Sequence, residues 1–218
     1  MQRIERTKTG KTNTKYQTPK MASREEILKA VKQNQPELLP MPSLDQFLEQ
    51  GLEEQQEDPI AQFTTVVEGI GAKVYRVNNH QEIIEQIKQD FDTKAIRIVA
   101  TEDDYSEIAK PFTGLDNHEL ADVELMILPA HFAVAENGAC WVNDELYKER
   151  VLPFIPQHLA LVVKKENFVA TMHHAYQQIG NKQYGFGTFI AGPSKTADIE
   201  QSLVLGAHGP RSLSVFVI

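Results

Sequence analysis

Residues 158–163 read HLALVV, and residues 95–100 read AIRIVA. Both are short apolar runs rich in branched side chains, typical of strands that are buried on both faces of a parallel sheet. Segments 62–70, 81–89 and 168–179 have the apolar spacing of helices. Strands that alternate with helices predict an α/β fold, and we expect a three-layer sandwich around a largely parallel sheet.

The same criteria predict the remaining elements. The segment HFAVAENGACWVND at 131–144 predicts two short strands joined by a turn, because Asn-Gly is the commonest hairpin turn. The other predicted strands are 73–77, 123–128, 187–191 and 214–218, and the other predicted helices are 23–33, 106–110 and 199–205.

Composition bounds the class of protein. The 218 residues, 41% hydrophobic with a net charge of −8, suffice for one substantial core. The single cysteine, Cys140, forms no internal disulfide and cannot alone hold a zinc ion or an iron–sulfur cluster. We expect a cytoplasmic protein with no membrane span, because no apolar run approaches about 18 residues and no signal peptide opens the chain.

The N-terminal part differs from the body. Residues 1–20 hold six Lys or Arg residues against one acidic residue and almost nothing apolar, which predicts a basic, disordered extension. Residues 21–60 predict a helix capped by Ser23, then an extended arm with one short helix near 44–50. Residues 61–218 form the predicted α/β domain. Its acidic character argues against nucleic acid as the main partner.

The segment GPSKTAD at 192–198 lies between a predicted strand and a predicted helix. Such a loop directs backbone N–H groups and the positive end of a helix dipole into one small volume, which suits an anion. The spacing departs from the phosphate loop, since Pro193 follows the glycine. Asp198 is expected to cap the helix or to face the ligand. The other ligand-binding candidates are Gly192, Ser194, Lys195 and Thr196.

Two other loops follow predicted strands. Glu136, on the turn Glu-Asn-Gly, is a candidate nucleophile or general base, with Asn137 and Gly138 as ligand-binding candidates beside it. The alternative is an ordinary hairpin turn. The loop 101–104 has no assignable pattern. His208 is expected to serve a turn on the opposite edge, and no histidine pair has metal-ligand spacing, so we expect no metal site in this chain alone.

Three segments together carry a family resemblance: AENG at 135–138, LPFIPQHLALVV at 152–163 and AGPSKTADIEQSLVLGAHGPRSLSVFV at 191–217. They resemble the LutC/YkgG family of LUD-domain proteins over about residues 21–218. This chain reads Ala-Glu-Asn-Gly-Ala where members tend to read Ala-Glu-Thr-Gly-Thr. The resemblance implies the NagB/RpiA/CoA transferase-like fold, shared with sugar-phosphate isomerases. Glu136 also resembles the nucleophilic glutamate of CoA transferases.

The resemblance implies a role, with two iron–sulfur partner proteins, in oxidising L-lactate to pyruvate. The clusters would belong to the partners, and this chain would bind no cofactor alone. Our first hypothesis is therefore a non-redox subunit that docks its partners and binds a small anionic ligand at Lys195. The rival is a stand-alone acyl- or CoA-transfer or sugar-phosphate enzyme that uses Glu136 and Lys195. Whether the chain is itself an enzyme stays open.

Overall fold

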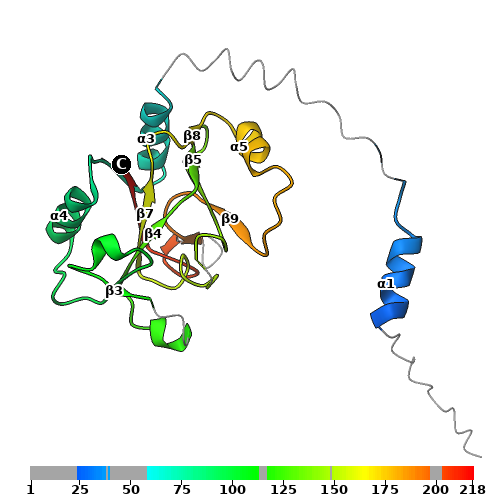
Figure 1. The fold of residues 1–218 in the computed structure, drawn as a ribbon, viewed down its shortest axis with the longest axis horizontal. Helices are drawn as coiled ribbons and strands as arrows, with labels where there is room; N and C mark the ends of the chain where they lie inside the picture. The colour runs from blue at the N-terminus through cyan, green and yellow to red at the C-terminus, as the bar shows by residue number, and fades with distance from the viewer. Residues whose placement is uncertain (1–23, 38, 40–57, 113–116, 148, 197–202) are drawn as a thin grey trace, which may run out of the picture. The chain divides into compact units, whose positions relative to one another are not determined.

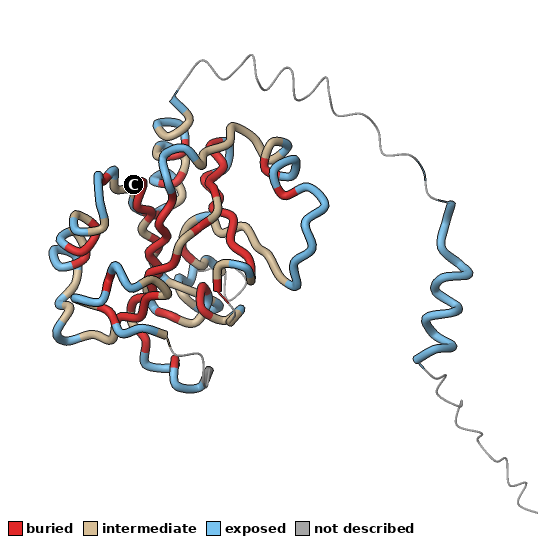
Figure 2. Tube along the Cα trace, in the orientation of Figure 1, coloured by how far each residue is buried: buried red, intermediate tan, exposed pale blue. Residues whose placement is uncertain are grey.

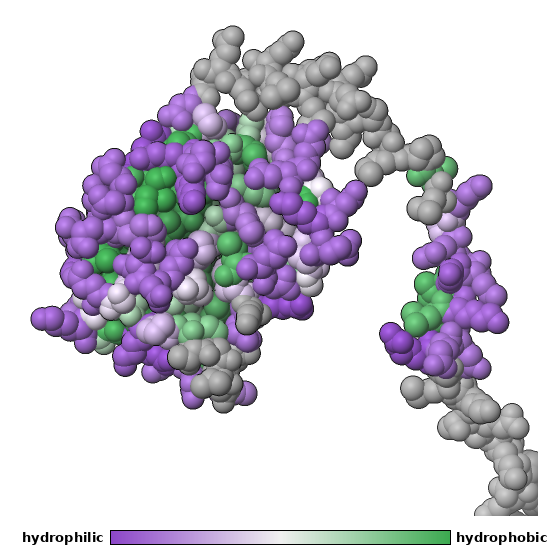
Figure 3. Space-filling view, in the orientation of Figure 1, coloured by the Kyte–Doolittle hydropathy of each residue, from purple (hydrophilic) through white to green (hydrophobic). Residues whose placement is uncertain are grey.

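The computed structural model describes residues 24–37, 39, 58–112, 117–147, 149–196 and 203–218 (Figure 1). The chain divides into two compact units, residues 1–43 and 44–218. In the first unit the described element is the predicted helix, α1 (Arg24–Gln33). Its apolar side chains Ile27, Leu28 and Val31 are exposed and form an apolar patch on the helix (Figure 3).

The second unit is built on a six-stranded parallel sheet. Its strand order is β1-β12-β7-β4-β2-β3, and every neighbouring pair is parallel. The predicted α/β class and largely parallel sheet are thereby confirmed. The strands are β1 (Lys73–Arg76), β2 (Ile98–Ala100), β3 (Lys110–Pro111), β4 (Leu125–Pro129), β7 (His158–Val163) and β12 (Ser212–Val217).

A second, four-stranded sheet has the order β8-β5-β6-β9. Its strands β5 (Phe132–Val134) and β6 (Ala139–Asn143) form the predicted antiparallel hairpin, with Phe132 opposite Trp141. On one side β9 (Gly187–Ile190) pairs antiparallel with β6, and on the other β8 (Phe168–Val169) pairs parallel with β5. The predicted strand 187–191 therefore exists, but it belongs to this second sheet.

Three apolar clusters define the layers of the second unit. Helix α4 (His80–Asp90) packs through Ile83, Ile84 and Ile87 on one face of the parallel sheet. The opposite face packs against the second sheet and helix α3 (Pro59–Gly69). Helix α5 (Met172–Ile179) covers the outer face of the second sheet. Figure 1 shows α4 and α5 on opposite sides of the two sheets, and Figure 2 shows the buried residues along the strands between them.

One predicted helix is wrong, and the described end of another differs from its prediction. Residues 106–110 lie in turns after a short 3-10 helix, η1 (Asp103–Tyr105), and then enter β3, because Lys110 pairs with Val99 of β2. Of the predicted helix 199–205, residues 199–202 lie outside the described residues, and its end forms strand β11 (Val204–Leu205), paired antiparallel with β10 (Lys195–Thr196). Sheet pairing thus overrides a weak helical pattern in both places.

The other boundaries shift less. The predicted helix 168–179 begins at Met172, where the Thr171 side chain accepts a hydrogen bond from the His174 N–H, and its first two residues form β8. The predicted short helix near 44–50, the Ser23 cap and the basic extension 1–20 lie outside the described residues.

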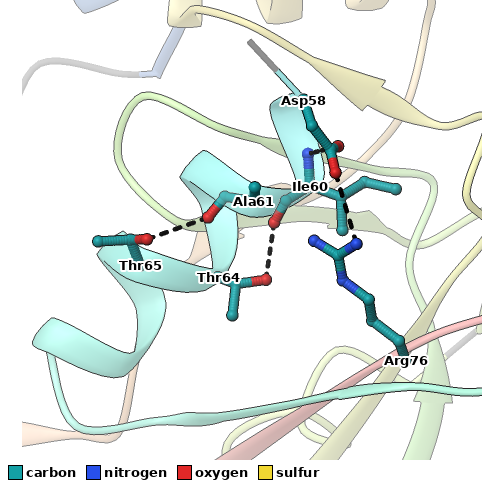
Figure 4. Close-up of polar contacts among 6 residues, drawn as sticks. All are labelled: Asp58, Ile60, Ala61, Thr64, Thr65 and Arg76. Carbon is teal, nitrogen blue, oxygen red and sulfur yellow. Dashed lines mark hydrogen bonds and ion pairs between the residues drawn. The ribbon is translucent and has the colours of Figure 1, made fainter.

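The start of α3 is fixed by Asp58 (Figure 4). Its Oδ1 accepts a 2.9 Å hydrogen bond from the Ile60 N–H, which satisfies one of the free N–H groups at a helix start. Its Oδ2 lies 3.4 Å from Arg76 Nη1, at the end of β1. Asp58 therefore both caps α3 and ties it to the edge strand of the parallel sheet.

Replacing Asp58 separates these two roles. We expect Asp58→Ala to lower the free energy of unfolding by about 1 kcal/mol, because the cap is lost. Asp58→Asn keeps a capping oxygen and loses only the exposed ion pair, so we expect a loss of at most a few tenths of a kcal/mol. Urea denaturation of the three proteins measures both effects. Equal losses in the two variants would contradict the capping role.

Candidate functional site

The carboxyl ends of the parallel strands border a cleft of about 570 Å³. Open α/β sheets bind ligands at this edge, because the loops that follow the strands gather there. His80 follows β1, Thr101 and Glu102 follow β2, His131 follows β4, and Lys164 follows β7, and all five line the cleft. Side chains that follow four strands of the sheet thus converge on one hollow.

The wall after β2 is acidic. Glu102 is partly buried, and this burial raises the pKa of its carboxyl above the usual value. His80 opposes that rise, Asp104 adds to it, and Lys164 opposes it. The carboxyl is consequently a better proton donor near neutral pH than an exposed glutamate. Next to it the Thr101 hydroxyl oxygen is buried and has no hydrogen-bond partner among the described residues.

His80 is the first residue of helix α4. The Asn79 side chain caps this helix by accepting a 3.0 Å hydrogen bond from the Glu82 N–H. The His80 Nδ1 lies 2.9 Å from the hydroxyl of buried Tyr105. Burial raises the pKa of that hydroxyl, which therefore stays protonated and can donate to the imidazole.

A second hollow of about 250 Å³ lies beside the cleft. It is lined by aromatic and amide side chains of the second sheet and of the region around α5, among them Trp141, Asn143, Gln178 and Tyr184. His131, Glu145 and Asn167 line both hollows. The two hollows therefore share a wall, and one small ligand has access to groups from both.

A polar network forms the shared wall. Asn143 is buried, and its Oδ1 lies 2.6 Å from His131 Nε2 and accepts a 3.0 Å hydrogen bond from the Glu145 N–H. Its Nδ2 donates to Glu145 Oε2 at 3.1 Å, and that oxygen lies 4.0 Å from His131 Nε2. The three side chains are thus held in one arrangement.

The loop predicted to bind an anion lies elsewhere. The Lys195 ammonium donates to the carbonyl of Ile70, before β1, and the Ser194 N–H donates to the carbonyl of Pro210, before β12, at 2.8 Å. Both carbonyls are at the amino ends of the parallel strands. The prediction of a loop is wrong at Lys195 and Thr196, which form β10, and the preceding strand belongs to the second sheet. Gly192 precedes the same hairpin, Asp198 lies outside the described residues, and anion binding at this loop stays a prediction.

The Glu-Asn-Gly turn is also separate from the cleft. The Glu136 carboxylate accepts a 2.8 Å hydrogen bond from the Met172 N–H, at the positive end of α5. Asn137 Oδ1 accepts from the Ala139 N–H at 3.1 Å. Gly138 has φ +71°, and a Cβ there would lie 2.6 Å from the Val67 side chain. These contacts give the three residues structural roles, and a catalytic role for Glu136 stays a prediction.

Sequence reasoning selected the loop 101–104 as lying at the ligand edge but assigned it no chemistry, and it did not select His80, His131, Asn143, Glu145 or Lys164. The sequence did contain a signal for three of these residues. His80, His131 and Lys164 each come soon after a strand of the parallel sheet, where ligand-binding loops are expected. Asn143 and Glu145 come close to His131 only because β6 pairs with β5, which begins beside His131.

The described residues contain no group of three or more His, Cys, Asp or Glu side chains arranged to hold a metal ion. Cys140 is fully buried, and burial raises the pKa of its thiol to about 12, so the thiol is not a ready metal ligand. No helix in the described part of the chain has the length and apolar content needed to cross a bilayer.

Comparison with known proteins finds similarity to one family over about half of the chain. Residues 115–218 match the family model of the LUD domain. Over 111 residues the chain is 32% identical to lactate utilization protein C of Shouchella clausii, a match that covers 48% of this chain and 47% of that protein. It is 29% identical over 112 residues to the protein of the same name from Oceanobacillus iheyensis, covering 48% of each. The chain spans about half the length of the curated relatives it matches.

Among solved structures, the fold is similar to the crystal structure of a DUF162 family protein from Deinococcus radiodurans. The TM-score is 0.56 at 20% identity, and the match covers 73% of this chain and 95% of that one. This similarity supports the α/β fold. A specific relation to the NagB/RpiA/CoA transferase-like fold stays a prediction.

The role of Gly138 can be measured by adding one methyl group. We expect Gly138→Ala to lower the free energy of unfolding by about 1–3 kcal/mol, because the left-handed backbone and the Val67 contact both resist a Cβ. Gly69→Ala is the control, since nothing lies within 4 Å of a Cβ at that helical position. We expect it to be neutral or stabilising. Thermal or urea unfolding distinguishes the two, and equal effects would contradict the packing argument.

The raised pKa of Glu102 makes stability depend on pH. Because the folded state holds the Glu102 proton more tightly than the unfolded state, stability contributed by the protonated group is lost as pH rises from about 4.5 toward the raised pKa. We expect Glu102→Gln to gain stability relative to the unmodified protein between pH 4.5 and 7.5. Urea midpoints measured across this range test it, with Glu166→Gln as an exposed control for the lost charge. A pH-independent difference would contradict the assignment.

Proposed function

Since residues 115–218 match the family model of the LUD domain, we propose that the chain is a lactate-utilization protein. It acts as a non-redox subunit beside iron–sulfur partner proteins that oxidise L-lactate to pyruvate. The observation that carries this proposal is the similarity of about half the chain to proteins named lactate utilization protein C.

The ligand site of this subunit is the cleft at the carboxyl ends of the parallel strands. The family match includes four residues that line one side of it, His131, Glu145, Lys164 and Asn167. It also includes Asn143, which lines the smaller hollow beside it. His80, Thr101 and Glu102, on the other side, precede the matched residues. The cleft thus combines residues inside the matched region with residues from the strands that precede it.

The assignment of the iron–sulfur clusters to partners rests on ligand chemistry. Such clusters are held mainly by cysteine thiolates, usually four of them. Cys140 is the only cysteine of this sequence, and it is buried between β5 and β9 in the second sheet. Electron transfer is therefore proposed for the partners, and binding of a small ligand for this subunit.

The rival enzyme hypothesis depends on Glu136 and Lys195. Both charged groups already have partners within the chain, since Glu136 accepts from the Met172 N–H and Lys195 donates to the Ile70 carbonyl. A nucleophile and an anion anchor need free groups that face a common hollow. Neither residue lines the cleft or the smaller hollow. The cleft is for this reason the better-supported ligand site.

Co-purification tests the proposal. We expect a tagged full chain isolated from its native host to bring down iron-containing partners, and the eluate to reduce an electron-accepting dye with L-lactate. Propionate, which lacks the hydroxyl group, is the substrate control. In parallel, deletion of the gene should abolish growth on L-lactate, and the unmodified gene should restore it.

A different result of the same experiments would refute the proposed function. A chain that elutes free of iron and partners, from a host whose deletion strain grows on L-lactate at the normal rate, would refute the proposed function. Screening of acyl-CoA and sugar-phosphate ligands by thermal shift would then address the rival enzyme.

A further inference from the structure

His131 stands in the wall that separates the cleft from the smaller hollow. It is the second residue after the end of β4, and its backbone N–H donates to the Trp141 carbonyl at 2.9 Å, which fixes it beside β6. Its side chain is 30% exposed. It lines both hollows, so a ligand in either one can reach it.

The contacts of Asn143 determine which ring nitrogen of His131 carries hydrogen. A backbone N–H, that of Glu145, donates to one terminal atom of the Asn143 amide, which must therefore be the oxygen. The other terminal atom contacts the Glu145 carboxylate, which accepts only, and must be the NH₂ group. The atom 2.6 Å from His131 Nε2 is thus an acceptor. Nε2 therefore carries the hydrogen.

In a neutral imidazole the other nitrogen then carries a lone pair. Nδ1 of His131 is accordingly a hydrogen-bond acceptor, and it has no hydrogen-bond partner among the residues that the structure describes. A histidine whose tautomer is fixed by a buried neighbour, with its second nitrogen free, is typical of a group that contacts a ligand.

Other side chains around His131 complement a small polar molecule. The cleft supplies the ammonium group of Lys164 and the amide of Asn167, and the smaller hollow supplies Lys182 and Gln178. Ammonium groups attract a carboxylate, and amides bind either a hydroxyl or a carboxylate. Of the nearby acids, Glu145 is already engaged by Asn143.

We propose that His131 anchors a binding site for a small 2-hydroxy carboxylate, with its Nδ1 accepting a hydrogen bond from the ligand's hydroxyl group and Asn143 holding the ring in that tautomer. Lys164 or Lys182 attracts the carboxylate. The ligand class rests on the proposed function, whereas the role of the imidazole rests on the network of Asn143 and Glu145.

The proposal makes a distinction between closely related acids. A lone pair attracts the hydroxyl hydrogen of L-lactate but repels the keto oxygen of pyruvate, and propionate offers no hydroxyl. We therefore expect the full chain to bind L-lactate about tenfold or more tightly than either pyruvate or propionate. Isothermal titration calorimetry with the three acids, on the chain and on the complex isolated with it, measures this preference.

Variants connect the preference to the residues. His131→Gln keeps an amide able to donate to Asn143 but loses the imidazole acceptor, and we expect it to bind L-lactate about tenfold or more weakly, with propionate unchanged. His208→Gln, the same substitution at an exposed position before β12, should bind like the unmodified protein. Asn143→Leu should abolish the preference for L-lactate over pyruvate by freeing the tautomer.

The tautomer of His131 can be measured directly. Long-range proton–nitrogen NMR of the unmodified chain should show His131 protonated on Nε2 when the ring is neutral, and this measurement remains decisive if Asn143→Leu fails to fold. Four results would each overturn the proposal. They are protonation on Nδ1, equal affinity for the three acids, binding of none of them, and unchanged affinity in His131→Gln. If the complex forms and oxidises lactate while any of these results is found, only this inference fails. If the chain shows the expected preference but no iron-containing complex forms, the proposed function fails instead.

Discussion

The rest of the structure depends on the burial of β7 between two parallel neighbours. Each residue of this strand from Leu159 to Val163 is buried, with Leu159, Leu161 and Val163 facing the second sheet and Ala160 and Val162 facing α4. A strand buried on both faces fixes its own register, since a slip of one residue would exchange its two sets of side chains. Because β12 and β4 are both parallel to it, their carboxyl ends meet at one edge, which is the edge that carries the cleft.

Half of the second sheet belongs to the crossover between β4 and β7. Two parallel neighbours need a connection that leaves the sheet and returns, and in most α/β proteins a helix supplies it. Here the hairpin β5–β6 lies in that connection, and β8 and β9 come from the chain that follows β7. The hairpin brings Asn143 and Glu145 back to His131, at the start of the connection. Topology and the polar network are thus consequences of the same crossover.

Periodicity predicted the parts of the fold in which burial dominates. The strands β4, β7 and β12 and the hairpin β5–β6 follow from apolar runs and the Asn-Gly turn, and α4 follows from its apolar spacing. Periodicity does not specify which strand pairs with which, so nothing in the sequence of β9 indicated that it joins the second sheet. The error placed Lys195 at the ligand edge, whereas its contact with Ile70 lies at the other one. The network of His131, Asn143 and Glu145 requires that same pairing information and was missed for the same reason.

The composition of the smaller hollow has a practical consequence. Trp141 is the only tryptophan of the chain, and it stands in the wall of that hollow, packed against Phe189 and Tyr184. Its partner across the hairpin, Phe132, directly follows His131. All indole emission from the unlabelled protein therefore originates beside the network of His131, Asn143 and Glu145. Quenching or a spectral shift on addition of a small molecule would report events at this one location, with no second fluorophore of its kind to obscure them.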